Sequence, residues 1–420
     1  MSRLSYGNAA PFDAKGRELS FDDPLPTVMG LNEMHNGHQF VIDELMPTIA
    51  PRPDQTDKPP YRVPSMAEIA AIEPNGLQIV STFSGCGGSC LGFKMAGYRV
   101  LWANEFIPAA QDVYRANHPD TILDTRNIRD VTGASILDAI GLDVGEIDVL
   151  EGSPPCASFS TAGKREKHWG KNKAYSDTVQ RTDDLFFEFV RLLDGIKPKV
   201  FVAENVSGLV KGSAKGYFKE ILAAMKACGY TVEAKLLDAQ WLGVPQARQR
   251  IIFVGCRSDL GRAPAFPKPL PYRYSVRDAL PWITAQGDNA GFGGGAHSPA
   301  AVPSPTIGAS PQTGNGTYPP SLVEVRAIRD DRGAFGNGGD ITDRPSPTVL
   351  SDSVGTHWME SDSTERRKFT IDELKRICAF PDDFILTGTY AQQWERLGRA
   401  VPPVMMRTVA DAIAKEIFDK

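Results

Sequence analysis

Apolar runs typical of buried strands alternate with segments of helical periodicity from about residue 78 onward. The run Leu77–Val80 leads through a glycine-rich turn into a segment with Leu91 and Phe93 at helical positions. A second run, Val100–Ala103, precedes the helical pattern of Pro108–Asn117. This alternation is typical of βαβ units and predicts an α/β fold with a parallel, doubly wound sheet. Further strands are expected at 144–150, 200–203, 231–237 and 250–254, and helices at 182–193 and 217–228.

Two stretches lack this alternation. Residues 1–75 are rich in Pro and Asp and predict an irregular extension, apart from a short helix at 65–72 that Ser65 would cap. Residues 258–365 are rich in Gly, Pro, Ser and Asp, which indicates a small domain of loops and short strands, or a disordered insert. Regular patterns return in a helix at 370–380 and in a final helix that follows Gly398 and ends near Phe418.

The composition excludes several classes of protein. A hydrophobic content of 41% in 420 residues is enough for a substantial core. No apolar stretch approaches the roughly 20 residues of a membrane span, and the N-terminus lacks a secretory signal pattern. Six irregularly spaced cysteines predict reduced thiols in a cytoplasmic compartment. No metal site is expected, because Cys86 and Cys90 have no second pair of ligands nearby.

The net charge of −5 does not indicate a nucleic-acid-binding protein, so such binding would need local basic patches. Two basic runs are present: Lys164, Arg165, Lys167, Lys171 and Lys173, and then Arg366, Arg367 and Lys368. A solvated surface is the alternative interpretation of such a run.

Two reactive side chains follow apolar runs. Cys156 comes directly after Gly152–Pro155, where two prolines fix the backbone at the end of the run 147–150. Glu204 ends the run Val200–Ala203. In an open α/β sheet both would reach the crevice at the carboxyl edge. A thiol there can act as a covalent nucleophile, although a free cysteine is more commonly a buried small hydrophobe.

The turn from Phe83 to Gly88 joins a strand to a helix and lets the backbone approach a ligand closely. Such a turn can hold NAD, FAD or S-adenosylmethionine. Its spacing is not the G-x-G-x-x-G of dinucleotide-binding folds. Glu105, at the end of the second strand, suits the hydroxyl groups of a ribose.

These features, together with the run Gln246–Arg250, stand in an order and spacing that resembles the DNA cytosine-5 methyltransferase family of bacteria and phages. The resemblance begins near residue 78 and reaches the C-terminus, with a gap at 257–365. It implies a Rossmann-like, S-adenosylmethionine-dependent sheet with a smaller, irregular target-recognition domain. The implied division is 1–75 as N-terminal extension, 76–257 as the first catalytic segment, 258–387 as the target-recognition domain, and 388–420 as a C-terminal helix that returns to the catalytic domain.

The resemblance assigns catalytic roles to four residues. The Cys156 thiolate would add to C6 of a cytosine flipped out of the duplex and form a covalent adduct. Glu204 would protonate N3 as a general acid, with a capping or salt-bridging carboxylate as the alternative. Arg248 and Arg250 would steady O2 of the base, the loop and nearby phosphates, with ordinary surface charge as the alternative.

The resemblance also implies a site for S-adenosylmethionine. Its residues would be Phe83, Ser84, Gly85, Gly87, Gly88, Asn104, Glu105, Phe106, Asn127, Ile128, Pro155, Leu185, Arg399, Ala400 and Val401. Three sites depart from the family pattern: Ser81 and Asn127 replace aspartates, and the dipeptide Ala157-Ser158 replaces Gln-Pro after the cysteine. At a fourth, Arg399 replaces an asparagine. Its side chain either turns outward to a phosphate or carboxylate, or accommodates a carboxylated S-adenosylmethionine.

The sequence therefore predicts a sequence-specific DNA cytosine-5 methyltransferase in the cytoplasm of a bacterium or a phage-infected cell. It would act as a monomer on double-stranded DNA, without a membrane, and a cognate restriction endonuclease is a second implied partner. An RNA (tRNA) cytosine-5 methyltransferase is one alternative, which the long insert at 258–365 disfavours. A transferase of a carboxylated S-adenosylmethionine, a non-catalytic DNA-binding relative and a nicotinamide or flavin oxidoreductase are the others.

Overall fold

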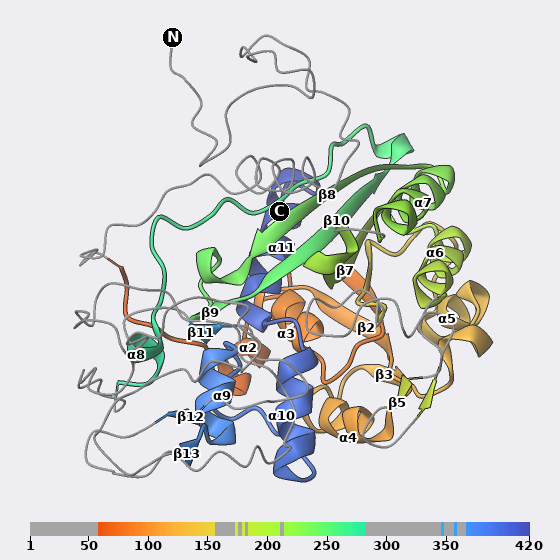
Figure 1. Cartoon of the computed structure of the whole chain (residues 1–420). Helices are drawn as coiled ribbons and strands as arrows, with labels where there is room; N and C mark the ends of the chain where they lie inside the picture. Colours follow the sequence, from red (N-terminus) through yellow and green to blue (C-terminus); the bar gives the residue numbers. More distant parts are fainter. Residues whose placement is uncertain are drawn as a thin grey trace, which may run out of the picture.

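The computed structural model describes residues 58–155, 173–174, 179–180, 184–210, 214–281, 346–347, 357–358 and 367–420 (Figure 1). Cys156 and the basic residues 164–171 lie outside the described residues, as do Arg366 and most of 282–366. Among the described residues, no helix combines the length and the apolar character that crossing a bilayer requires.

A seven-stranded sheet forms the centre of the described structure, in the order β3-β2-β1-β4-β7-β10-β8. Its strands are β1 (Gln78–Thr82), β2 (Arg99–Asn104), β3 (Ile122–Asp124), β4 (Val149–Gly152), β7 (Val200–Val206), β8 (Tyr230–Asp238) and β10 (Gln249–Arg257). The first five strands of this order are parallel, as the sequence predicts. The prediction is wrong for β10, which runs antiparallel to both neighbours. Residues 239–248 are too few for the helical crossover that a parallel connection needs.

Helices cover both faces of the sheet. Ile79 joins the cluster that contains α3 and α11, whereas the next residue, Val80, joins the cluster that contains α5, α6 and α7. Successive side chains of a strand point to opposite faces of the sheet. A continuous apolar run therefore contributes side chains to the hydrophobic cores on both faces. Figure 1 shows α5, α6 and α7 together along one side of the sheet. The helices are α3 (Gly88–Met95), α4 (Pro108–Asn117), α5 (Gly133–Ile140), α6 (Leu185–Ile196), α7 (Ala214–Ala227) and α11 (Pro403–Glu416).

One expected strand is shorter than its apolar pattern. The sequence predicts a strand at 144–150, but β4 begins only at Val149. Val144 is 61% exposed, and Gly145 has a φ of 91° in the turn that follows. The backbone N–H of Gly145 donates to the Ile196 carbonyl, so the turn before β4 is fixed to the end of α6.

The C-terminal segment packs against the first helix of the sheet domain. A Cβ atom at Gly92 of α3 would lie 2.5 Å from the Pro403 carbonyl oxygen of α11, so only glycine permits this approach. The family resemblance predicted such a return of the final helix. A further apolar cluster joins Leu91 and Met95 of α3 to Phe369 and Phe380, which flank α9 (Ile371–Ile377). The residues at 369–384 therefore pack directly on the sheet domain.

The described part of the N-terminal extension also contacts this region. Helix α2 (Met66–Ala70) has Ser65 as its N-cap, with Glu68 completing a capping box, so the predicted short helix is confirmed. The Tyr61 hydroxyl donates to the Arg376 carbonyl at 2.7 Å.

The remaining helices and strands complete the described structure. They are α8 (Val276–Ala279), α10 (Tyr390–Arg399), η1 (Ile128–Asp130), η3 (Ser207–Val210), η4 (Ala239–Trp241), η5 (Ser258–Leu260), β5 (Lys173–Ala174), β6 (Val179–Gln180), β9 (Gln246–Ala247), β11 (Ser346–Pro347), β12 (His357–Trp358) and β13 (Arg367–Lys368).

Candidate active site

The glycine turn after β1 lies against the C-terminal segment. Phe83 and Gly85 have φ angles of 54° and 58°, and Gly87 has 89°. A Cβ atom at Gly88 would collide with the Val401 carbonyl oxygen and approach Ala400. A Cβ atom at Gly85 would meet nothing within 4 Å, so the tip of the turn is open. The structure thus brings two predicted cofactor-binding segments together, although more than 300 residues separate them in the sequence.

Glu105 supports this turn from the end of β2. Its Oε2 accepts the Gly85 N–H at 2.7 Å, and its Oε1 accepts the Ile107 N–H at 2.7 Å. Burial raises the pKa of the Glu105 carboxyl, while these backbone hydrogen bonds and nearby Arg396 lower it. A carboxylate has about four lone-pair sites, so Glu105 retains capacity to accept from a ligand hydroxyl.

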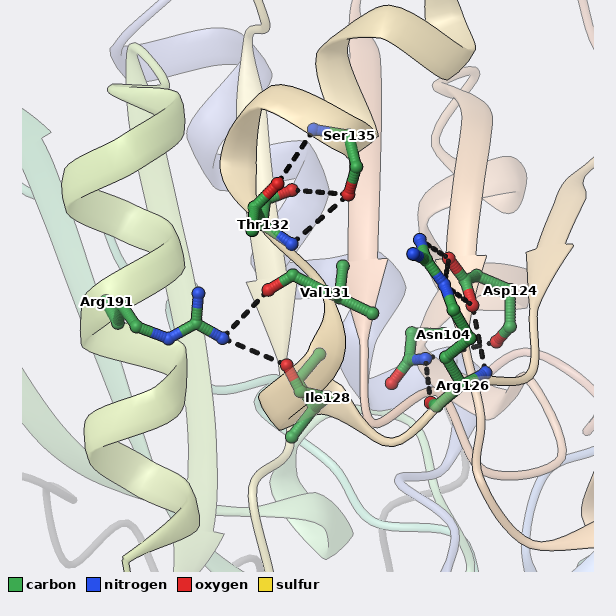
Figure 2. A network of polar contacts seen from close by, with 8 residues as sticks. All are labelled: Asn104, Asp124, Arg126, Ile128, Val131, Thr132, Ser135 and Arg191. Atoms are coloured by element: carbon green, nitrogen blue, oxygen red, sulfur yellow. Dashed lines mark hydrogen bonds and ion pairs between the residues drawn. The ribbon is translucent and has the colours of Figure 1, made fainter.

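The loop at 125–131, which follows β3, is held by side chains from two sides (Figure 2). Asn104 Nδ2 donates to the carbonyls of Asp124, at 3.1 Å, and of Arg126, at 2.9 Å. Arg191 of α6 donates to the carbonyls of Ile128 and Val131, both at 2.9 Å. These contacts fix the loop where the sequence places part of the cofactor site.

The predicted cofactor residues of this loop have structural partners. Asn127 Oδ1 accepts the Arg129 N–H at 3.1 Å and caps η1. Ile128 and Leu185 are buried in the cluster below it. Phe83 packs on the edge of the same cluster, while Phe106 and Pro155 are half-buried.

Glu204 of β7 and Arg250 of β10 form an ion pair between these two adjacent strands. Arg250 Nε lies 2.6 Å from Glu204 Oε1, and about a tenth of each side chain is exposed. Burial raises the pKa of the Glu204 carboxyl, and the opposing influence of Arg250 and Arg248 is smaller. Desolvation therefore outweighs the ion pair, and the pKa of the carboxyl group lies above its ordinary value.

Arg248 has a different environment from Arg250. It is 1% exposed, and its terminal nitrogens donate to the carbonyls of Gly398, at 3.0 Å, and Arg399, at 3.3 Å. Burial lowers its pKa to about 9, so it stays charged at neutral pH. Arg248 therefore satisfies carbonyls that α10 leaves unpaired at its C-terminus.

The segment before Cys156 lies beside the strand that carries Glu204. Gly152, the last residue of β4, is the register partner of Ala203 in β7. Asn205 Nδ2 donates to the Pro154 carbonyl at 3.1 Å. The sequence predicted that the two strand ends lie together, and β4 and β7 are adjacent strands for the described residues up to Pro155. Cys156 itself lies outside them.

Arg399 is the last residue of α10 and pairs with a residue of the same helix. Its Nη2 lies 2.6 Å from Glu395 Oε1, and 30% of its side chain is exposed. Arg396 Nη2 contacts the other oxygen of Glu395 at 3.0 Å. The geometry favours an Arg399 paired with a carboxylate over one that accommodates a carboxylated cofactor. The carboxylate belongs to the protein itself, one turn earlier in the same helix.

Three residues near the site were not assigned from the sequence. Asn205 directly follows Glu204, and Glu151 directly follows the apolar run 147–150. Glu395 precedes Arg399 by four residues, a helical spacing that could have revealed it. In the described part of the chain, no group of three or more His, Cys, Asp or Glu side chains could hold a metal ion.

A seven-stranded sheet with one antiparallel strand, a glycine turn after β1 and a buried carboxyl group at the end of β7 define a Rossmann-like methyltransferase. The family model of C-5 cytosine-specific DNA methylases matches residues 77–416. The chain therefore belongs to this family, as its sequence motifs predicted, and is an enzyme of the DNA (cytosine-5-)-methyltransferase class.

Two bacterial methyltransferases are similar to this chain over most of its length. The Type II methyltransferase M1.HphI of Haemophilus parahaemolyticus is 33% identical over 344 residues, which cover 81% of this chain and 87% of that protein. M.NgoPII of Neisseria gonorrhoeae is 28% identical over 361 residues, covering 82% and 97%.

Two solved structures share the fold. A DNA modification methyltransferase from an Escherichia coli prophage has a TM-score of 0.57 at 19% identity, and DNMT2 of Spodoptera frugiperda has 0.53 at 18%. Each comparison covers 82% of this chain and 100% of the other.

Proposed function

We propose that this enzyme transfers a methyl group from S-adenosylmethionine to C5 of a cytosine at a specific sequence in double-stranded DNA. Cys156 is the nucleophile and Glu204 the general acid. The observation that carries this proposal is the buried Glu204–Arg250 pair, next to the segment that leads to Cys156. A carboxyl group with a raised pKa, on the strand beside the cysteine loop, is what protonation of a cytosine ring requires.

The glycine turn fits the cofactor. Its tip is open at Gly85, its backbone has the left-handed conformation that close approach favours, and the Glu105 carboxyl group lies beside it. Phe83, Leu185 and the loop at Asn127 would hold the adenosine part, and Glu105 the ribose. When bound, the cofactor supplies an electrophilic methyl group.

The proposed reaction requires a flipped cytosine, because the ring is inaccessible inside a stacked duplex. The Cys156 thiolate adds to C6, and the displaced ring electrons take up a proton from Glu204 at N3. C5 would thereby become nucleophilic and form a bond to the methyl group, while the S–CH3 bond breaks and S-adenosylhomocysteine leaves as a neutral thioether. A base then removes the C5 proton, the C5–C6 double bond re-forms, Cys156 leaves as a thiolate, and the N3 proton returns to Glu204.

The two arginines have separate parts in this proposal. Arg250 contacts Glu204 and would stabilise the charge that develops on O2 of the base. Arg248 acts indirectly, because its contacts to Gly398 and Arg399 hold the end of α10 against the site.

A trapping experiment tests the mechanism. The target is first mapped by methylation-sensitive sequencing of host DNA after expression. A duplex with 5-fluorocytosine at that position should then form a denaturation-resistant adduct, because fluorine blocks the final elimination. Cys156→Ser should abolish both adduct and turnover, since a hydroxyl group supplies almost no anion at neutral pH. Cys228→Ser, at a half-buried cysteine after α7, is the matched control and should retain both. An adduct with Cys156→Ser contradicts the assignment.

We further propose that residues 258–387 contain the part that reads the DNA sequence. The packing of Phe369 and Phe380 on α3 would fix this region to the catalytic domain. Exchanging 258–365 for the corresponding part of a relative should change the methylated sequence and leave cofactor binding intact. An unchanged target in an active hybrid contradicts this assignment. The same trapping assay with fluorinated RNA tests the alternative RNA substrate, and co-purification tests for an endonuclease partner.

A further inference from the structure

Glu151 is a buried carboxyl group that the proposed reaction does not use. It is 1% exposed and stands in β4, directly before Gly152. Hydroxyl groups hold it: Ser81 Oγ donates to Oε2 at 2.6 Å, and Ser153 Oγ donates to Oε1 at 3.3 Å. Its position in β4 is the register partner of Ser81 in β1, so the contact to Ser81 is a cross-strand pair.

These contacts belong to a longer chain of hydrogen bonds. Ser81 Oγ also lies 2.9 Å from Ser84 Oγ, which belongs to the glycine turn. Ser153 belongs to the segment that leads to Cys156. The order Ser84, Ser81, Glu151, Ser153 therefore connects the turn on the cofactor side with the segment on the cysteine side. A backbone hydrogen bond joins the same two segments: the Ser153 N–H donates to the Thr82 carbonyl at 3.4 Å.

Stability alone does not account for a carboxyl group here. Its neighbours Val149 and Leu150 are fully buried and apolar. Burial raises the pKa of Glu151 to about 7, hydrogen bonds from Ser81 and Ser89 oppose this shift, and nearby Glu204 adds to it. Apolar residues of similar volume commonly serve such a position at least as well. A polar group retained in a costly environment next to a reaction centre points to a function.

We infer that Glu151 is a positioning residue that holds the segment 152–155 in register with the cofactor turn. This inference rests on the proposed function, because it assumes a cofactor at the turn and a nucleophile at Cys156. Misplacing a reacting group by about 1 Å can reduce a rate by about a hundredfold. Loss of this series of hydrogen bonds should therefore slow methyl transfer, while the cofactor keeps its contacts with Phe83 and Glu105.

The test compares Glu151→Leu with Glu151→Gln. Leucine removes the hydrogen bonds, whereas glutamine can accept from Ser81 through its oxygen and donate to Ser153 through its amide nitrogen. The readouts are the dissociation constant of S-adenosylmethionine without DNA, the single-turnover rate with DNA, and the melting temperature. Glu151→Leu should lose about tenfold or more in rate with cofactor affinity within about threefold, and Glu151→Gln should restore most of the rate.

Two further variants complete the design. Ser153→Ala should reproduce the loss of rate. Combining it with Glu151→Leu should add little, because both substitutions interrupt the same series of hydrogen bonds. Asp138→Leu removes an exposed carboxylate of α5 and should leave all three readouts unchanged.

Three outcomes overturn the inference. They are a wild-type rate in Glu151→Leu, an equal loss in Glu151→Gln, and, if Glu151→Leu does not fold, a wild-type rate in Ser153→Ala. A wild-type chain that forms no adduct with fluorinated DNA contradicts the proposed function itself, and the inference with it. Normal trapping with a wild-type rate in Glu151→Leu contradicts the inference alone.

Discussion

Arg250 Nε lies 2.6 Å from Glu204 Oε1, across the antiparallel pair β10 and β7. An exposed pair of this kind would keep the carboxyl group ionised. Here both side chains are nearly buried, and desolvation raises the pKa of Glu204 in spite of its partner. The arginine thus orients the carboxyl group without removing its capacity to hold a proton.

Replacing this carboxyl group should affect the chemical step. Glu204→Gln keeps the shape and loses the transferable proton, so single-turnover methylation should fall by about 10²–10⁴-fold. Glu233→Gln, at an exposed position of β8, should retain the wild-type rate. Quenched-flow measurement with labelled cofactor provides both numbers. A near-normal rate for Glu204→Gln would show that another group protonates N3.

Arg248 should matter for stability. Arg248→Met removes the donors to the carbonyls of Gly398 and Arg399 and leaves them buried. We expect a loss of about 2–4 kcal/mol in the free energy of unfolding, measured with urea. Arg262→Met removes an exposed ion pair with Asp419 and should change the free energy of unfolding by less than about 1 kcal/mol. Equal midpoints for the two variants would contradict the capping role.

The glycine turn provides a second contrast. Gly88→Ala places a Cβ atom against the Val401 carbonyl oxygen, so α3 and the C-terminal segment must separate. Overpacking of this kind should destabilise by about 1–3 kcal/mol. Gly216→Ala lies in α7 with open space around it and should stabilise by about 0.5–1 kcal/mol. Thermal unfolding of both variants decides the matter, and a neutral Gly88→Ala would show that the turn tolerates the shift.

Local patterns in the sequence predicted much of the fold. The apolar runs gave most strands, and the glycine turn and Glu204 were found because each follows such a run. The antiparallel direction of β10 could not be found this way, since hydrophobic pattern carries no strand direction. Arg248 and Arg250 look equivalent in the sequence, and only tertiary contacts separate them. Glu151 was hidden because its partner Ser81 is a cross-strand neighbour.

Glu151 should also make stability depend on pH. Its pKa is about 7 in the folded chain against an ordinary value of 4.5, so the folded state binds more protons between these values. The contribution of Glu151 to wild-type stability should therefore fall as pH rises from about 4.5 to 7. Glu151→Leu lacks this loss, so its stability relative to wild type should increase between pH 5 and pH 8. The limit is about 3 kcal/mol, because one pKa unit corresponds to about 1.4 kcal/mol. A constant difference in urea titrations would show that the carboxyl group does not titrate in this range.

The last prediction concerns the choice of methyl donor. A guanidinium group free to face the cofactor would favour a carboxylated S-adenosylmethionine by about one or two decades. Arg399 instead contacts Glu395 at 2.6 Å, and that carboxylate offsets its charge. Wild type and Arg399→Asn should therefore give the same ratio of methylated to carboxymethylated cytosine when both donors compete. Nucleoside mass spectrometry measures this ratio. A carboxymethyl product that depends on Arg399 would show that the side chain leaves Glu395 and contacts the donor.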